Sequence, residues 1–164
     1  MNTRQVHSTD ARQLVQLIEE VERTTDTMLY GAGERSLSVE QLKERIESFG
    51  TDASTILVAE IEGSLVGYLM VIAGTAYRNK HSAYIVIGVS EKYRGKGVGK
   101  ALFTSMDKWA IENRLHRLEL TVMTTNTAAI VLYEKSGFSK EGLKRESLFV
   151  GGQYVDEYYM AKLI

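Results

Sequence analysis

Apolar residues recur along this chain with two different periods, and these separate predicted helices from predicted strands. Residues 3–7 are predicted to form a short strand, and residues 14–21 carry apolar side chains at helical spacing. Ser38 and Gln41 stand three positions apart, as in a capping box, and predict the start of a second helix. The first third of the chain therefore predicts a strand followed by two helices.

The rest of the chain alternates between strand-like and helix-like segments. Strands are predicted over residues 55–61, 65–72, 83–89 and 117–122, helices over residues 98–112 and 126–135, and a final hairpin over residues 147–160. Glycine-containing turns are expected at residues 62–64 and 151–152. The resulting order, β-α-α-β-β-β-α-β-α-β-β, predicts an α/β protein with a mixed sheet in a single domain spanning residues 1–164.

Gly88 lies inside the apolar strand predicted over residues 83–89. A glycine within a strand often marks a bulge or a close approach of the backbone. We expect a bulge at this position, which would release the N–H group of Val89 from the strand ladder.

A glycine-rich, basic turn connects this strand to the next helix. Its residues are Arg94, Gly95, Lys96, Gly97, Val98, Gly99 and Lys100, with Lys92 just before them. Glycines allow backbone N–H groups to approach a ligand, and a helix N-terminus favours negative charge. The turn therefore predicts a binding site for a pyrophosphate-bearing cofactor.

Two common phosphate-binding patterns do not fit this turn. A P-loop requires a glycine where Arg94 stands and a serine or threonine where Ala101 stands. A dinucleotide-binding pattern starting at Gly95 would require a third glycine at Lys100. The cofactor is therefore expected to belong to another class.

A second segment, residues 126–138, has the caps of a helix at both ends. Asn126 suits the N-cap and Gly137 suits the position just past the C-terminus. Tyr133 lies seven residues after Asn126, so that the two side chains share one helix face. This face has the groups to line a cofactor, although a half-buried core position is the simpler interpretation of Tyr133 alone.

The two segments together, in this order and spacing, resemble the signature of the GNAT superfamily of N-acetyltransferases. The resemblance rests on Arg94-x-x-Gly97-x-Gly99 and on Asn126 through Tyr133 to Gly137-Phe138. It implies the GNAT fold, an α+β type with a mixed, mostly antiparallel central sheet flanked by helices, whose fourth and fifth strands splay apart. It also implies an enzyme that moves the acetyl group of acetyl-CoA directly to a primary amine.

The resemblance also implies roles for individual residues. The cofactor-binding residues would be Ile87, Gly88, Val89, Arg94, Gly95, Lys96, Gly97, Val98, Gly99, Lys100, Asn126, Tyr133 and Lys135. The Val89 N–H group would stabilise the developing oxyanion, and Tyr133 would protonate the departing thiolate. Tyr30, Glu34 and Glu119 are candidate acceptor-site residues; neither carboxylate is assigned as the base, and a water relay is the default.

Composition restricts the chemistry further. The 164 residues contain no cysteine, so that disulfides, thiolate metal sites and a cysteine nucleophile are excluded. The net charge is −1, which gives no overall attraction to nucleic acid or to an anionic membrane. Three isolated histidines show no metal-binding spacing, and we expect no metal. We also expect a cytoplasmic protein without nucleic-acid or membrane partners, acting on a small-molecule amine and able to form a homodimer through its last hairpin.

Two other functions stay open at this point. A protein N-terminal or lysine acetyltransferase would need a wide acidic groove, whereas a small-molecule enzyme would need an enclosed pocket. A non-catalytic acyl-CoA-binding module is the alternative outside the enzymes.

Overall fold

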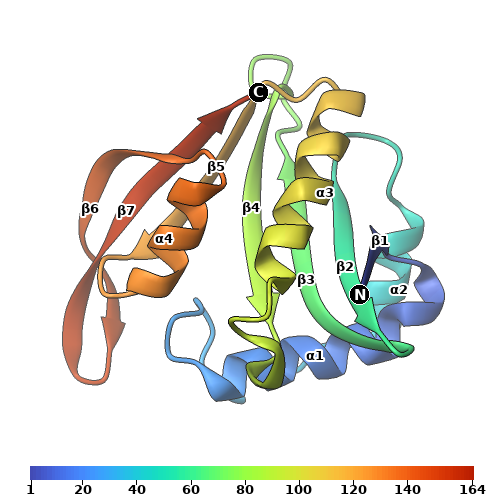
Figure 1. The fold of residues 1–164 in the computed structure, drawn as a ribbon, viewed down its shortest axis with the longest axis horizontal. Coiled ribbons are helices and arrows are strands. Elements are labelled where there is room, and N and C mark those ends of the chain that lie inside the picture. The colour runs from blue at the N-terminus through green and yellow to red at the C-terminus, as the bar shows by residue number, and fades with distance from the viewer.

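A single mixed seven-stranded sheet runs through the computed structural model, which describes all residues from 1 to 164. The strands are β1 (Asn2–Gln5), β2 (Thr55–Ile61), β3 (Ser64–Ala73), β4 (Ser82–Val89), β5 (Arg117–Met123), β6 (Ser139–Val150) and β7 (Gln153–Leu163). They lie in the order β1-β2-β3-β4-β5-β7-β6 (Figure 1). All neighbouring strands pair antiparallel except β4 and β5, which pair parallel.

Four helices cover the two faces of the sheet. They are α1 (Ala11–Thr24), α2 (Val39–Glu47), α3 (Val98–Glu112) and α4 (Thr127–Lys135). Helices α1 and α2 pack with Val58 and Tyr68 on one face, and α3 and α4 pack with Leu69 and Leu118 on the other. The predicted order of strands and helices and the mixed, mostly antiparallel sheet are confirmed. Two short 3₁₀ turns, Ser8–Asp10 and Glu91–Tyr93, were not predicted.

The predicted caps and turns that set these elements are present. Ser38 Oγ accepts a hydrogen bond from the Gln41 N–H group at 3.2 Å and thereby caps α2. Glu62 and Gly63, with φ of 50° and 79°, form a two-residue turn between β2 and β3. The last hairpin turns at Gly151–Gly152 as predicted, but its strands extend well beyond residues 147–160 in both directions.

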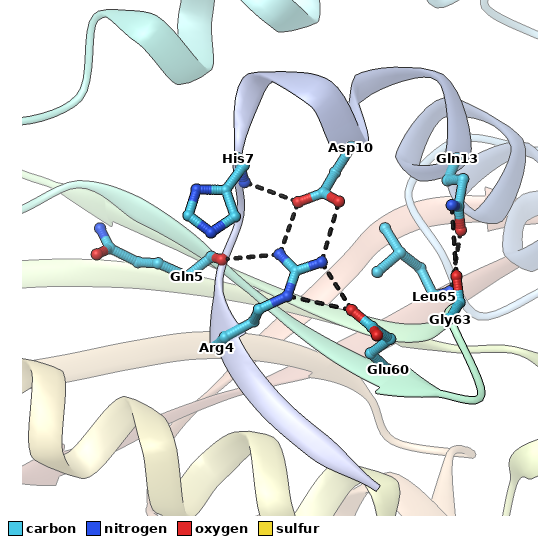
Figure 2. A network of polar contacts seen from close by, with 8 residues as sticks. All are labelled: Arg4, Gln5, His7, Asp10, Gln13, Glu60, Gly63 and Leu65. Atoms are coloured by element: carbon cyan, nitrogen blue, oxygen red, sulfur yellow. Dashed lines mark hydrogen bonds and ion pairs between the residues drawn. The ribbon is translucent and has the colours of Figure 1, made fainter.

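The N-terminal strand is held by an ion-pair network (Figure 2). The Arg4 guanidinium donates to both carboxylate oxygens of Asp10 at 2.7 and 3.0 Å and to Glu60 at 2.8 Å. Asp10 also accepts from the His7 N–H group at 2.7 Å. The hydrogen bonds from Arg4 lower the pKa of Asp10 below its ordinary value. This network ties β1, the start of α1 and the end of β2 together.

Candidate active site

Strands β4 and β5 are joined at one end and separate toward the other. Their parallel pairing covers only Ser82–Tyr84 of β4 and Arg117–Glu119 of β5. Figure 1 shows the two strands together near the C-terminus of the chain and diverging away from it. We call the space between them the wedge, its closed end the vertex at Tyr84 and Glu119, and its open end the region beside Val89.

The expected bulge at Gly88 is absent, and that prediction is wrong. The β3–β4 register is continuous from Gly67 opposite Val89 to Ala73 opposite Ala83. The Ser90 N–H group donates to the Val66 carbonyl at 2.9 Å, and hydrogen-bonding direction alternates along an antiparallel ladder. The N–H groups of Ile87 and Val89 therefore point away from β3 and into the wedge, where β5 does not pair with them. The splay of β4 from β5, rather than a bulge, exposes these donors.

Gly88 is required by close packing instead. A Cβ atom at this position would lie 2.5 to 2.7 Å from the phenol ring and hydroxyl of Tyr68 on the neighbouring strand β3. These distances are shorter than carbon atoms tolerate, so only glycine fits. Of the two reasons for a glycine within a strand, a bulge or a close approach of another group, the structure shows the close approach at Gly88.

The glycine-rich turn lies at the open end of the wedge and leads into α3. Gly97 is the N-cap residue of α3 with φ of 84°, and Gly95 has φ of 71°. The first backbone bond of the helix runs from the Ala101 N–H group to the Gly97 carbonyl at 3.0 Å. The N–H groups that precede it, those of Val98, Gly99 and Lys100, have no acceptor in the chain. This helix end offers donors and a positive dipole to an anion.

Charge and packing around the turn agree with a site for phosphate. Lys92, Lys96 and Lys100 form no ion pair with any acidic side chain. A Cβ atom at Gly99 would approach the Leu132 side chain of α4 to 2.8 Å. Gly99 therefore allows α3 and α4 to pack closely. The three lysines leave the turn with a positive charge that no acidic side chain neutralises.

Arg94 faces a different set of partners. Its guanidinium donates to the Val89 carbonyl at 3.2 Å, to the Thr24 carbonyl at 3.3 Å and to the Thr24 hydroxyl at 2.9 Å. These bonds connect the C-terminal end of α1 to the end of β4. A contact of Arg94 with the cofactor stays a prediction.

Helix α4 has the predicted caps. Asn126 Oδ1 accepts from the Ala129 N–H group at 3.2 Å, and the Asn126 amide nitrogen makes no hydrogen bond within the chain. At the other end Gly137 has φ of 93°, and the Phe138 N–H group donates to the Tyr133 carbonyl at 3.0 Å. Lys135, also predicted to bind the cofactor, is the exposed last residue of the helix.

Tyr133 has a buried ring and a free hydroxyl. Its side chain packs edge-on against Phe103 at 5.7 Å, and the residue is 8% exposed. The hydroxyl forms no hydrogen bond with the protein, yet it is not sealed from solvent. Burial raises the pKa of Tyr133, and the nearby Tyr84 phenol raises it further. Tyr133 therefore keeps its proton well above neutral pH and can donate it.

A cavity of about 340 Å³ opens at the vertex of the wedge. It is lined by Tyr84, Arg117, Glu119, Leu120, Thr121, Glu141, Tyr159 and Met160. Arg117 donates to Glu119 at 2.7 Å and to both oxygens of Glu141 at 2.6 and 2.9 Å. Its hydrogen bonds lower the pKa of Glu141. Two carboxylates against one guanidinium leave this cavity with a negative charge.

The three predicted acceptor-site residues occupy different places. Glu119 lines the cavity. Glu34 instead accepts a hydrogen bond from the Gly31 N–H group within the loop that follows α1. Tyr30, in the same loop, lies beneath the Arg35 guanidinium at 4.3 Å. The structure therefore brings only Glu119 to the vertex.

Three polar residues were not singled out from the sequence. Tyr84 and Thr121 line the cavity, whereas Glu22, away from the cavity on α1, is a buried carboxylate that accepts two hydrogen bonds from Arg35 at 2.6 and 2.9 Å. A signal existed for two of them. Tyr84 is the one side chain with a polar group in the stretch from Ala83 to Val89, and Glu22 stands four residues after Ile18, on the apolar stripe of α1.

No group of three or more histidine or acidic side chains is placed to hold a metal ion. None of the helices combines the length and the apolar character that a bilayer crossing requires.

Comparison with known proteins identifies a family. The model of the Acetyltransferase (GNAT) family matches residues 13–138. The L-amino acid N-acetyltransferase AaaT of Escherichia coli (strain K12) is 39% identical over 111 residues, which are 65% of this chain and 67% of that protein.

Solved structures share the fold along nearly the whole chain. An acetyltransferase of the GNAT family from Streptococcus pneumoniae superposes with a TM-score of 0.95 at 28% identity, covering 99% of each chain. The protein yncA from Salmonella typhimurium, solved with its cofactor acetyl-CoA, has a TM-score of 0.88 at 17% identity, covering 99% of this chain and 92% of that one.

Proposed function

This chain belongs to the GNAT family of acetyltransferases, and we propose that it moves the acetyl group of acetyl-CoA directly to the amine of a small, amino acid-like molecule. The observation that carries the proposal is the wedge between β4 and β5. One end of it meets the glycine-rich turn with its unbonded N–H groups, and the other end meets a small acidic cavity.

The open end of the wedge fits the pyrophosphate of acetyl-CoA. Three unbonded N–H groups at the start of α3, the two glycines with positive φ before them and the lysines around them suit two adjacent phosphates in geometry and charge. The side-chain NH2 group of Asn126, which makes no hydrogen bond within the chain, faces the pantetheine arm in this proposal. Acetyl-CoA supplies an activated thioester, and the protein positions it.

The strand edge holds the arm of the cofactor and its carbonyl oxygen. The N–H groups of Ile87 and Val89 are the backbone donors that β4 offers to the wedge. Val89, the predicted oxyanion donor, and Ile87, which lies closer to the vertex, together bind the thioester arm. A donor of this kind stabilises the charge that develops on the thioester oxygen and typically lowers the barrier by ~2.7–4 kcal/mol.

The acceptor amine enters the cavity at the vertex. An alkylammonium ion has a pKa of ~10 and must lose a proton before it attacks. Glu119 is the predicted carboxylate that lines the cavity, whereas Glu34 is bonded within its loop. We therefore assign proton removal to Glu119 acting through water. Tyr133 returns a proton to the sulfur that leaves.

A thiol-release assay tests this function. Protein and acetyl-CoA are mixed with L-amino acids, polyamines, aminoglycosides and short peptides, and free CoA thiol is measured. Because the chain contains no cysteine, any thiol above the blank comes from CoA. Release that depends on an amino acid is the expected result. Release only with peptides would replace the small-molecule proposal by a protein acetyltransferase, and no release with any amine would contradict it.

A further inference from the structure

The phenol of Tyr68 lies over the end of β4 from the neighbouring strand. Tyr68 on β3 is paired with Gly88 on β4. Its Cε1, Cζ and Oη atoms lie 2.5 to 2.7 Å from the position that a Cβ atom of Gly88 would take. Since neighbouring strands are only ~4.8 Å apart, the outer end of the ring covers β4 itself. The hydroxyl therefore stands beside the peptide that joins Gly88 to Val89, whose N–H group is the proposed oxyanion donor.

This hydroxyl is buried and has no partner within the chain. Tyr68 is 1% exposed, and its hydroxyl makes no hydrogen bond with the protein. The Tyr84 hydroxyl, by contrast, lies 2.7 Å from Thr121 Oγ1. Every fully enclosed side-chain polar atom of the protein has a hydrogen-bond partner, so the small exposed part of Tyr68 includes its oxygen. Because a buried polar group without a partner costs free energy, this oxygen is available to a bound molecule.

The two faces of the sheet contribute different groups to the proposed reaction. Tyr133 packs with α3 and α4 on one face, and Tyr68 packs with α1 on the other. A thioester bound to the N–H groups of Ile87 and Val89 lies between these faces, in the wedge. A nucleophile attacks a carbonyl carbon from above or below its plane. Because Tyr133 and α4 cover one side, the amine approaches from the side of Tyr68.

Helix α1 brings a second unpaired acceptor to this face. Glu22 is 4% exposed, and both hydrogen bonds from Arg35 end on its Oε1 atom, so that Oε2 has no partner within the chain. Val21, the residue before Glu22, packs in the same buried cluster as Tyr68. Burial raises the pKa of Tyr68, and the negative charge of Glu22 raises it further, in agreement with this placement.

The last turn of α1, which carries Glu22, is tied to Val89. The Arg94 guanidinium donates to the Val89 carbonyl at 3.2 Å and to the Thr24 hydroxyl at 2.9 Å. Thr24 is the last residue of α1 and stands two residues after Glu22. One guanidinium therefore spans from this turn of the helix to the proposed oxyanion donor.

We propose that the Tyr68 hydroxyl binds the amine of the acceptor, with Glu22 Oε2 as a second hydrogen-bond acceptor on the same face. The inference rests on the proposed function, because it names the groups that hold the attacking nitrogen. Tyr84, which lines the cavity, and Val89 are five residues apart on β4, so a nitrogen that enters at the vertex needs partners at the carbonyl itself. The two oxygens orient it toward the thioester carbon, and its proton leaves through water to Glu119.

Tyr68→Phe tests the inference, because it removes the hydroxyl and keeps the ring that packs on Gly88. kcat/KM is measured for the L-amino acid that gives the fastest thiol release. A hydrogen bond to a charged group changes binding by about 10- to 100-fold, so kcat/KM is expected to fall by about tenfold or more. Glu22→Gln, which removes the charge and keeps the shape, should lower it as well. The Kd for acetyl-CoA, measured by calorimetry, should stay at the wild-type value in both variants.

A second readout separates contact with the amine from damage to the fold. The desamino analogue of the same amino acid, with hydrogen in place of the amino group, serves as a competitive inhibitor. Its inhibition constant should be the same in the wild type, Tyr68→Phe and Glu22→Gln, since it lacks the group that the two oxygens contact. Tyr77→Phe, at an exposed tyrosine, and Glu19→Gln, at an exposed carboxylate of α1, are the matched controls and should keep the wild-type kcat/KM.

The outcomes distinguish this inference from the proposed function. If thiol is released but kcat/KM is unchanged in Tyr68→Phe, or the inhibition constant changes as much as kcat/KM, the inference fails and the proposed function stands. If no amine releases thiol, the proposed function fails, and L-amino acids are titrated by calorimetry into protein saturated with CoA. Weaker binding to Tyr68→Phe than to the wild type would then support the inference, and equal binding or none would overturn it.

Discussion

At the scale of single residues, Tyr133 joins two properties that a proton donor needs. Its ring is fixed by packing against Phe103 and Phe138. Its hydroxyl makes no hydrogen bond within the protein that would compete with the sulfur for the proton. The raised pKa keeps the phenol protonated across the neutral range. A free thiol has a pKa of ~8.5, so the proton assists the departure of the thiolate without being indispensable.

Tyr133→Phe is therefore expected to lower kcat by about 100-fold, the lower end of what a general acid contributes, and to leave measurable activity. The KM for acetyl-CoA should change little, because the ring and its packing are kept. Steady-state kinetics at several pH values provide the measurement. Since the pKa of Tyr133 is raised and not lowered, the activity of the wild type should not fall between pH ~7 and ~9 through loss of this proton. An unchanged kcat would remove Tyr133 from the acid role; Tyr154→Phe, at an exposed tyrosine in the last hairpin, is the matched control.

At the scale of elements, the proposed phosphate site on the connection from β4 through the glycine-rich turn to α3 requires that the backbone of this turn stays accessible. Gly97 adopts φ of 84° and has no atom within 4 Å of an added Cβ. A side chain there would project from the helix N-terminus into open space, where the phosphates are proposed to bind.

Gly97→Asp is expected to weaken acetyl-CoA binding about tenfold or more, because it places a negative charge at the helix N-terminus where the phosphates are proposed to bind. Calorimetric titration with acetyl-CoA provides the measurement. Gly63→Asp is the matched control, since Gly63 has φ of 79°, equally open space and a place in the β2–β3 turn. Both variants carry the same backbone strain, and only Gly97→Asp should lose affinity. Equal affinity in the two variants would show that the turn does not bind the cofactor.

Elements whose signals are local in sequence could be predicted. Ser38 and Asn126 cap their helices with their own side chains, and Gly137 ends α4 in the left-handed conformation. Each of these features depends on residues three or four positions away, so a short window of sequence contains the whole cause.

Features that depend on distant residues could not be predicted. The sequence predicts a bulge at Gly88, because the Tyr68 phenol that requires a glycine there lies on another strand. The bond between Tyr84 and Thr121 joins residues 37 positions apart. The candidate carboxylates Glu34 and Glu119 looked equivalent in sequence, and only the folded chain separates them. The site residues themselves stay predictions until the variants are measured.

At the scale of the whole molecule, the sheet places a helix N-terminus and an acidic cavity at opposite ends of one wedge. The first helix is tied to this wedge by two contacts. Arg94 bonds to Thr24 at the end of α1, and the Ser90 hydroxyl donates to Glu20 at 2.7 Å. The end of β4, which carries the proposed donors, is thereby tied to α1, the helix that covers one face of the sheet.

The central claim is direct transfer from acetyl-CoA to an amine. The most direct measurement uses acetyl-CoA with an isotopically labelled acetyl group and an L-amino acid, followed by mass spectrometry of the small molecules and of the intact protein. The account predicts that the label appears on the acceptor nitrogen while the protein mass stays unchanged throughout the reaction. Label on the protein as an acyl-enzyme, or label recovered only as free acetate, would contradict it.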